Sequence, residues 1–330
     1  MPTDPYLNDP DRWGVSMAQH AELMLPCLDA AGVKSIAEVG AFAGDLTRVL
    51  VEWAQGAGAK VAAVDPSPQP GLVALAEEHT ELDLIRETSL AALPALPELP
   101  DAIVIDGDHN YWTVHEELRL IGERAPGAEL PLLLFHDVVW PHGRRDDYFD
   151  ATQIPEEYRV PMIEGRGGIV PGDPGIATGG LPYPRSAERE GGEHNGVLTA
   201  VEDFVASRER LRLVVVPVFF GFGVLWHQDA PYAAELARIL DPFDRNPILE
   251  RLEANRVHQL ARVHQTFNEL WAERGRRTEQ EQLLRRMLES SAFAVAERLS
   301  LLRMRAGVAT DQSVISREEV KRVLDDGARG

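Results

Sequence analysis

The chain has 330 residues and a formal net charge of −20, with 44% hydrophobic and 26% charged residues. This acidity argues against a nucleic acid or an anionic membrane as partner, because both require a basic protein face. The single cysteine, Cys27, excludes an intramolecular disulfide and a thiolate metal cluster. No stretch approaches 18 apolar residues, and the first residues lack the apolar core of a signal peptide, so we expect a cytoplasmic protein.

The first 135 residues predict a regular alternation of helices and strands. A helix is expected over residues 15–31, ending at Gly32, and a proline-punctuated stretch over residues 90–100. Alternating strands and helices form right-handed βαβ units, which build a parallel sheet covered on both faces. The predicted strands are residues 35–39, 60–64, 82–85, 102–105 and 132–135, and the helices between them are residues 45–55, 71–79 and 113–123.

The alternation stops after Trp140. The segment 141–195 is rich in glycine and proline, and a loop of that length is usually a functional lid or disordered. Within it, Arg144 and Arg145 are followed by two aspartates, a pattern typical of solvated surface. A helix is then predicted over residues 197–208, followed by strands over residues 211–216 and 222–226. Their short connection requires an antiparallel pair. The predicted fold is therefore α/β, a doubly wound, seven-stranded, mostly parallel sheet with an antiparallel last strand.

From residue 247 onward, leucines recur every three or four residues, which predicts helices over residues 249–270 and 283–302. Gly275 lies between the two runs, so we expect a helical hairpin or a longer, broken helix. Such an extension either packs on its own subunit or forms a homodimer. The expected organisation is an N-terminal helical segment (1–34), a sheet domain (35–230, with 141–195 as a substrate-side loop) and a C-terminal helical extension (231–330).

Chemistry-bearing residues gather where the predicted strands end. The sequence EVGAFAG, residues 38–44, follows the first strand, and its glycines allow close approach of a ligand to the start of a helix. It is not the dinucleotide pattern G-x-G-x-x-G, because Phe42 stands where the second glycine should be. Asp65 ends the second strand, where an acid can accept ribose hydroxyls. Together these features favour an adenosyl ligand at the sheet edge where parallel strands end.

Two later strands end in acids and histidines, in the sequences DGDH (106–109) and HD (136–137). Because neighbouring strand ends lie about 5 Å apart, Asp106 and Asp137 could share a divalent cation, which prefers carboxylate oxygens. His109 would lie beside that ion and could accept a proton from a hydroxyl group. The simpler alternative is that the aspartates cap helices and that His136 is a core histidine.

These motifs resemble those of class I S-adenosylmethionine-dependent methyltransferases over about residues 35–226. They are most similar to the bacterial branch that contains macrolide and aminocoumarin sugar O-methyltransferases and cephalosporin hydroxylase-like proteins. The resemblance implies that Asp65 holds the ribose and that Thr88 or Ser89 borders the adenine. It implies a cofactor site made by Glu38, Gly40, Ala41, Phe42, Gly44, Asp65, Thr88, Ser89, Asp106 and Gly107.

The resemblance also implies Mg²⁺ at Asp106 and Asp137, with His109 and Asp106 as catalytic residues and His109 as the general base. Metal-dependent relatives usually present two adjacent acids, or an acid and an asparagine, after the fifth strand. This chain has His136 followed by Asp137 there. Since histidine is a poorer Mg²⁺ ligand than a carboxylate, either His136 is a third, weak ligand or it points inward.

The expected function is an S-adenosylmethionine-dependent O-methyltransferase that acts on a hydroxyl of a small molecule, in particular a sugar of a glycosylated natural product. Residues 141–195 would close over the acceptor. Two alternatives remain at this stage. One is a nucleotide-dependent oxidoreductase on the same kind of sheet. The other is a non-catalytic binding or scaffold module that interacts through its helical arm.

Overall fold

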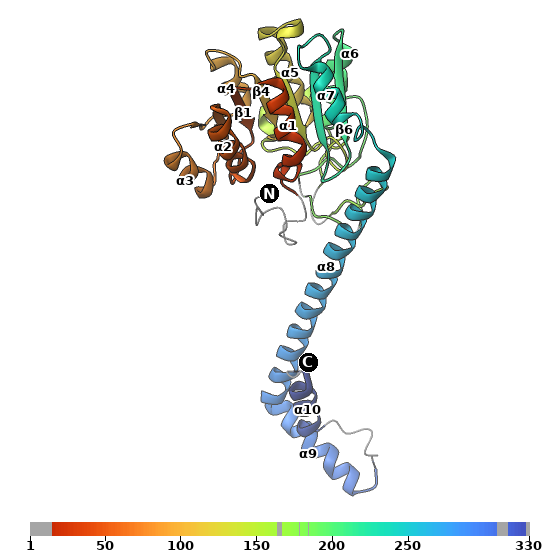
Figure 1. Cartoon of the computed structure of the whole chain (residues 1–330). Coiled ribbons are helices and arrows are strands. Elements are labelled where there is room, and N and C mark those ends of the chain that lie inside the picture. Colours follow the sequence, from red (N-terminus) through yellow and green to blue (C-terminus); the bar gives the residue numbers. More distant parts are fainter. Residues whose placement is uncertain (1–14, 164–166, 178, 184, 309–315, 328–330) are drawn as a thin grey trace. The chain divides into compact units, whose positions relative to one another are not determined.

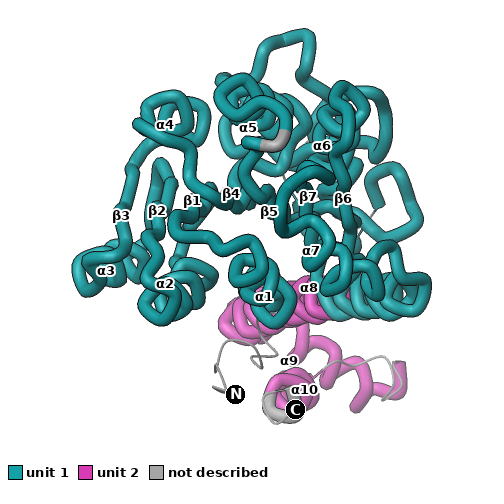
Figure 2. The backbone as a smooth tube through the Cα atoms, turned by 45° about the horizontal axis from the view of Figure 1, so that its top comes forward, with its two compact units in different colours: residues 1–264 teal, residues 265–330 magenta. Residues whose placement is uncertain are grey.

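The computed structural model describes residues 15–163, 167–177, 179–183, 185–308 and 316–327. The chain forms two compact units, Met1–His264 and Gln265–Gly330 (Figure 2). The first unit contains the sheet and every helix up to the first part of α8 (Pro247–Glu289); the elements in the described part of the second unit are helices (Figure 1). The domain boundaries expected at residues 34 and 230 stay predictions.

A seven-stranded sheet forms the centre of the first unit, with strand order β3-β2-β1-β4-β5-β7-β6. The first five strands are parallel, and β7 runs antiparallel to both β5 and β6. This confirms the predicted mostly parallel sheet with an antiparallel last strand. The strands are β1 (Ser35–Val39), β2 (Lys60–Val64), β3 (Leu82–Ile85), β4 (Ala102–Ile105), β5 (Leu132–His136), β6 (Leu211–Val216) and β7 (Phe222–His227).

Helices cover both faces of the sheet (Figure 2). The reason is visible in β5, where Leu132 and Leu134 face one apolar core and Leu133 and Phe135 face the other. A strand buried on both faces is an unbroken apolar run, as the sequence predicts. One layer contains α1 (Ala21–Ala31), preceded by the turn η2 (Met17–His20), with α2 (Asp45–Ala57), α3 (Pro70–Glu78) and α7 (Ala233–Leu240); the other contains α4 (Ser89–Ala95), α5 (Tyr111–Arg124) and α6 (Val197–Ala206).

Segment 141–195 is more ordered than the sequence predicts. Its described part contains the short helices η4 (Ala151–Gln153) and η5 (Glu156–Tyr158) and four isolated β-bridges; η3 (Gly127–Glu129) precedes β5. The expectation that Arg145 is solvated is wrong, because its side chain is fully buried and donates hydrogen bonds to three backbone carbonyls. A buried guanidinium needs such partners, and they fix the segment on itself.

Helix α8 continues through Gly275, so the predicted interruption there is wrong. An exposed glycine costs a helix only about 1 kcal/mol relative to alanine, which does not break it. The helix ends at Glu289, and the second unit continues with α9 (Ser291–Arg305) and α10 (Arg317–Gly327). Arg317 donates hydrogen bonds to Glu297 and to the carbonyl of Leu288. None of the helices in the described ranges combines the length and the apolarity needed to span a bilayer.

Candidate active site

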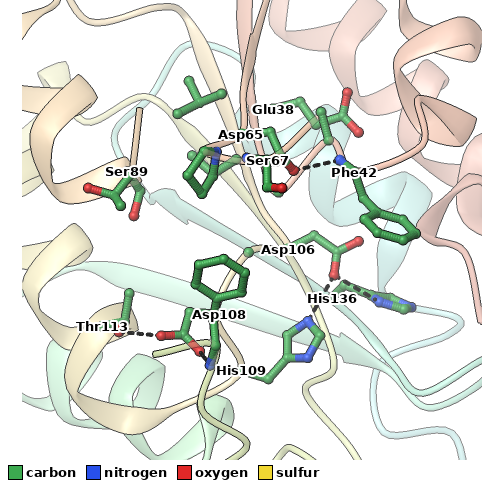
Figure 3. A pocket seen from close by; sticks show the side chains of 18 of the residues that line it. Glu38, Phe42, Asp65, Ser67, Ser89, Asp106, Asp108, His109, Thr113 and His136 are labelled. Carbon is green, nitrogen blue, oxygen red and sulfur yellow. Dashed lines mark hydrogen bonds and ion pairs between the residues drawn. The ribbon is translucent and has the colours of Figure 1, made fainter. Parts of the chain in front are cut away.

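A cavity of about 630 Å³ opens at the carboxyl edge of β1, β2, β4 and β5. Figure 3 shows the side chains that follow these strands converging on it. In open α/β sheets this edge, near the point where the strand order reverses, is where ligands bind. The strand order places that reversal between β1 and β4. The cavity is therefore where the sequence predicts the adenosyl ligand to lie.

The turn after β1 depends on a glycine at position 40. Gly40 has φ = +87°, and a Cβ there would lie 2.1 Å from the carbonyl oxygen of Asp106. The glycine thus allows the chain after β1 to pass directly against the chain after β4. Gly44 also has a positive φ, of 86°, and is the N-cap of α2. It does not line the cavity, whereas Gly40, Ala41 and Phe42 do.

Asp65, at the end of β2, joins two loops of the cavity. Its Oδ2 accepts a hydrogen bond of 2.7 Å from the backbone N–H of Phe42, and its Oδ1 accepts one of the same length from Ser67 (Figure 3). Each carboxylate oxygen can accept more than one hydrogen bond. Asp65 can therefore support the turn after β1 and still offer lone pairs to ribose hydroxyls.

Glu38, near the end of β1, is a buried carboxyl group at the cavity wall. Its Oε2 accepts a hydrogen bond of 2.6 Å from the Thr47 hydroxyl, a partner that sequence reasoning missed. Burial raises the pKa of Glu38 to about 8, although the Thr47 hydrogen bond opposes the change. A bound cation, such as the ammonium group of a methionine moiety, would favour the ionised carboxylate.

Two aspartates and two histidines meet at the ends of β4 and β5. His136 Nδ1 lies 3.2 Å from Asp106 Oδ1 and 3.3 Å from Asp137 Oδ2. His109 Nε2 lies 3.4 Å from Asp106 Oδ1 and 3.2 Å from Asp137 Oδ2. Figure 3 shows both imidazoles directed toward Asp106. The structure thus brings together all four residues that the sequence places at these strand ends.

The two aspartates are held ionised and the two histidines protonated. Burial opposes ionisation of Asp137, but the charges of His109 and His136 outweigh it and hold the Asp137 pKa well below its usual range. Asp106 shifts in the same direction, mainly because of His136. Burial would lower the pKa of His109, yet the charge of Asp137 and a hydrogen bond to Asp106 raise it to about 9. Charge pairing therefore stabilises this cluster.

Three of these residues fit a divalent cation, which on binding would take the place of the proton on His136 Nδ1. One ligand atom each from Asp106, His136 and Asp137 lies within 4.8 Å of the other two. His136 Nε2 lies 3.0 Å from the carbonyl oxygen of Phe219. Because a carbonyl can only accept, Nε2 carries a proton, and Nδ1 is the nitrogen that faces the carboxylates. This orientation is common for metal-binding histidines, whose second nitrogen donates to a carbonyl or carboxylate.

The remaining predicted cofactor residues lie around the same cavity. Thr88, Ser89 and Gly107 line it. The Ser89 end of the cavity lies at the start of α4, where Thr88 is the N-cap residue. Their predicted contacts with adenine stay predictions.

Sequence reasoning missed several residues that line the cavity from elsewhere in the chain. Segment 141–195 contributes Phe149, Asp150 and Gln153, and the Phe149 ring is 54% exposed. The segment before α1 contributes Ser16 and Met17. No local motif marks these positions, because only the tertiary path of the chain brings them to the sheet edge.

Sequence reasoning also missed His142, a neutral histidine that packs beside His109. Its ring stacks on His109 at a centroid distance of 5.0 Å, and Tyr183 meets its other side edge-on. Burial lowers the pKa of His142 to about 4, so it packs against His109 without adding a charge at neutral pH.

Part of the sequence matches a known protein family. Residues 37–138 match the family model described as "Methyltransferase domain". These residues run from β1 to just beyond β5 and include the glycine turn, Asp65, Asp106, His109 and the pair 136–137. The match confirms the predicted resemblance to S-adenosylmethionine-dependent methyltransferases, and it does not favour the oxidoreductase or the scaffold alternative.

Several solved structures resemble the chain at low identity. The methyltransferase PaMTH1 from Podospora anserina, solved with S-adenosylhomocysteine, is 17% identical, with 68% of this chain and 84% of that chain covered and a TM-score of 0.41. An O-methyltransferase from Bacillus cereus is 14% identical, with 69% of this chain and 92% of that chain covered and a TM-score of 0.42. The O-methyltransferase TomG from Streptomyces achromogenes is 14% identical, with 68% of this chain and 90% of that chain covered and a TM-score of 0.41. None of the curated proteins compared matches the sequence.

Proposed function

We propose that the chain transfers the methyl group of S-adenosylmethionine to a hydroxyl oxygen of a small molecule, with a sugar hydroxyl as the leading acceptor. In that reaction the oxygen–methyl bond forms, the sulfur–methyl bond breaks, and the hydroxyl proton leaves to a base. The observation that carries the proposal is the single cavity in which Glu38 and Asp65 meet the cluster of Asp106, His109 and Asp137.

The donor half of the cavity supports an adenosyl cofactor. Glu38 offers a buried carboxyl group to the positive amino group of the methionine part, and Asp65 offers its free lone pairs to the ribose. Thr88 and Ser89 line the same cavity and would border the adenine of the cofactor. Gly40 lines the same cavity and lets the turn after β1 pass against the backbone of Asp106.

The cluster at β4 and β5 supports a divalent cation at Asp106, His136 and Asp137. When bound, such an ion lowers the pKa of a hydroxyl group that it contacts and stabilises the resulting oxyanion. The donor set contains one imidazole nitrogen, and Mn²⁺ accepts nitrogen ligands more readily than Mg²⁺ does. We therefore expect this site to bind Mn²⁺ at least as tightly as Mg²⁺.

His109 is the proposed base. It lines the cavity, and its Nε2 faces the same two carboxylate oxygens as His136. With a pKa of about 9 in the protein without an ion, His109 carries a proton at neutral pH. A cation held by the two aspartates would lower the pKa of His109, because it would repel the positive charge of the protonated ring. The base is then available only when the site is complete.

The acceptor half of the cavity favours an uncharged or cationic molecule. Apart from His109 and His136, which pair with Asp106 and Asp137, the ionisable residues in the described lining of the cavity are seven acids, with neither lysine nor arginine. An anionic acceptor, such as a phosphorylated or sulfated sugar, would be repelled. Trp112, Phe149 and Phe42 offer apolar ring faces, and Asp150 and Gln153 offer hydrogen-bonding groups. Rings that can stack and polar groups that can bind hydroxyls suit a neutral or amino sugar.

A methyl-transfer screen tests this proposal. The full chain is incubated with methyl-labelled S-adenosylmethionine, Mn²⁺ or Mg²⁺, and panels of neutral, amino and anionic glycosides. We expect label in neutral or amino glycosides. Label confined to nitrogen or carbon positions, or to anionic acceptors, would contradict the proposed acceptor class.

For the helices of residues 265–330, two roles stay predictions: an appendage that packs on its own subunit, and an arm that forms a homodimer. Phe267, Leu270 and Trp271 are exposed on α8. If the extension forms a homodimer, light scattering on the full chain gives twice the monomer mass, and Trp271→Glu lowers the measured mass toward that of a monomer. If the extension is an appendage, both proteins give the monomer mass.

A further inference from the structure

The turn between β6 and β7 has an unusual backbone. Phe219 and Phe220 have φ values of +48° and +66°, and Gly221 follows with +97°. Left-handed conformations are unfavourable for residues with a Cβ, and two in succession require support from their surroundings. The same turn supplies the carbonyl group of Phe219, the acceptor for His136 Nε2. The position of that carbonyl therefore decides which ring nitrogen of His136 points toward the carboxylates.

Glu253, on the first part of α8, supports this turn directly. Its Oε2 accepts the backbone N–H of Phe219 at 3.0 Å, and its Oε1 accepts that of Phe220 at 2.9 Å. The side chain is buried. Two hydrogen bonds to a carboxylate hold consecutive amide groups in the orientation that the left-handed conformation needs. Few other contacts could fix both peptides at once.

Arg256 completes the support. Its Nε and one terminal nitrogen donate to the two oxygens of Glu253 at 2.7 and 2.6 Å, a two-pronged pair. Its guanidinium also lies over the ring of Phe220, 4.4 Å from the ring centre. The buried carboxylate is thus charge-compensated, which a buried charge requires. Glu253 and Arg256 lie on one helix, so the pair arrives at the turn as a rigid unit.

The opposite side of the turn is packed by His20. Its ring stacks on Phe222 at 5.0 Å and meets Phe219 and His136 edge-on at 5.9 and 6.0 Å. Burial lowers the pKa of His20 to about 3, so this ring is neutral. His136 therefore has an uncharged ring beside it, the Phe219 carbonyl at Nε2 and the two carboxylates at Nδ1.

We infer that Glu253 is a positioning residue for the ion site, acting through the Phe219 carbonyl to hold His136 with Nδ1 toward Asp106 and Asp137. This inference rests on one part of the proposed function, the divalent cation at Asp106, His136 and Asp137. It links helix α8, outside the matched residues 37–138, to the chemistry at β4 and β5. The start of α8 accordingly supports the site through the turn between β6 and β7, without lining the cavity.

The test compares three variants of the full chain. Glu253→Ala removes both acceptors, and Glu253→Gln keeps one carbonyl oxygen but replaces the other acceptor with a donor. Val257→Ala is the matched control, because Val257 is buried on the same part of α8 and belongs to the apolar cluster that holds Ile163, Ile169 and Phe220, so it weakens side-chain packing near the turn while leaving both Glu253 hydrogen bonds in place. It should lose stability by cavity formation without altering either amide of the turn.

Two measurements are made without S-adenosylmethionine. Mn²⁺ affinity is measured by electron paramagnetic resonance, and the His136 Nε2 proton is followed by ¹H–¹⁵N NMR. We expect about 10-fold weaker Mn²⁺ binding in Glu253→Ala, a smaller loss in Glu253→Gln, and unchanged affinity in Val257→Ala. The Nε2 proton, hydrogen-bonded in the parent and in Val257→Ala, should exchange rapidly with water in Glu253→Ala.

The outcomes separate the inference from the proposed function. If the parent binds no Mn²⁺, the ion proposal fails, while the Nε2 proton still tests the role of Glu253. If Glu253→Ala does not fold, Glu253→Gln decides. A folded Glu253 variant with parental Mn²⁺ affinity and a parental Nε2 proton signal would overturn the inference. So would an equal loss of affinity in Val257→Ala, because the effect would then be general destabilisation.

Discussion

A Cβ atom at Gly40 would lie 2.1 Å from the carbonyl oxygen of Asp106, so the turns after β1 and β4 are in direct backbone contact. The glycine that borders the donor half of the cavity is thus required by the chain that carries the ion site. Whatever displaces one turn displaces the other, which couples cofactor binding to the position of Asp106.

Gly40→Ala should therefore be strongly destabilising. The substitution adds backbone strain at φ = +87° to a clash with backbone atoms that cannot rotate away, and we expect a loss of roughly 3 kcal/mol or more. Chemical denaturation measures it. Gly56→Ala is the control, because Gly56 lies inside α2 with open space around it; helix propensity predicts a small gain in stability there. Equal stability of Gly40→Ala and the parent would show that the turn can relax.

Asp65→Ala should weaken binding of S-adenosylhomocysteine. The change removes the proposed ribose acceptor and releases the amides of Phe42 and Ser67, which Asp65 now holds. We expect at least a 10-fold loss of affinity, since hydrogen bonds to charged groups contribute about 1.5–3 kcal/mol each. Calorimetry measures the affinity, and Asp83→Ala, at an exposed position of β3, serves as control. Parental affinity in Asp65→Ala would remove the ribose assignment.

Glu117 makes stability depend on pH. It is fully buried on α5, and burial raises its pKa to about 8, although Ser89 opposes the shift. Because its folded pKa lies above its unfolded value, the neutral carboxyl stabilises the fold at low pH. That contribution falls as the pH rises from about 4.5 to 8. Glu117→Gln, which stays neutral, should lose less stability than the parent between pH 5 and pH 8, by about 2–4 kcal/mol. Thermal or urea unfolding at both pH values measures the difference; parallel pH profiles would contradict it.

His109→Asn should slow methyl transfer by about 10²–10⁴-fold, the usual contribution of a general base. Asparagine can keep one hydrogen bond to the aspartates but cannot accept a proton. Affinity for S-adenosylhomocysteine should stay within a few-fold of the parent, because His109 lies at the cluster and not beside Asp65 or Ser89 (Figure 3). Single-turnover rates measure the effect once an acceptor is found. Near-parental rates in His109→Asn would move the base elsewhere, with Asp108 next in line.

The parts that sequence predicts well are those whose signal is local. Buried parallel strands such as β4 are short apolar runs, and each is followed directly by the residue it delivers to the edge, as β4 is by Asp106. The sequence predicts only a proline-punctuated stretch where α4 lies, because Pro94 is inside that helix. Gly275 does not interrupt α8, since a helix of that length can absorb one glycine.

The parts that sequence does not predict depend on distant partners. Nothing near Arg145 indicates that it is buried; its acceptors are carbonyls of residues 174, 175 and 187. Likewise, Glu253 resembles any charged residue on a helix until the fold brings it to Phe219. For His136 the sequence allows two alternatives, a weak ligand or an inward-pointing ring. The structure shows a buried ring whose Nδ1 nevertheless faces both carboxylates.

Titration calorimetry of the full chain with S-adenosylhomocysteine tests the central claim most directly, with NADH as the comparison ligand. We predict one binding site per chain for S-adenosylhomocysteine, retained in excess chelator because Glu38, Asp65 and Ser89 need no ion, and no binding of NADH. Binding of NADH, or the absence of S-adenosylhomocysteine binding at millimolar concentration, would contradict the assignment of the cavity to methyl transfer.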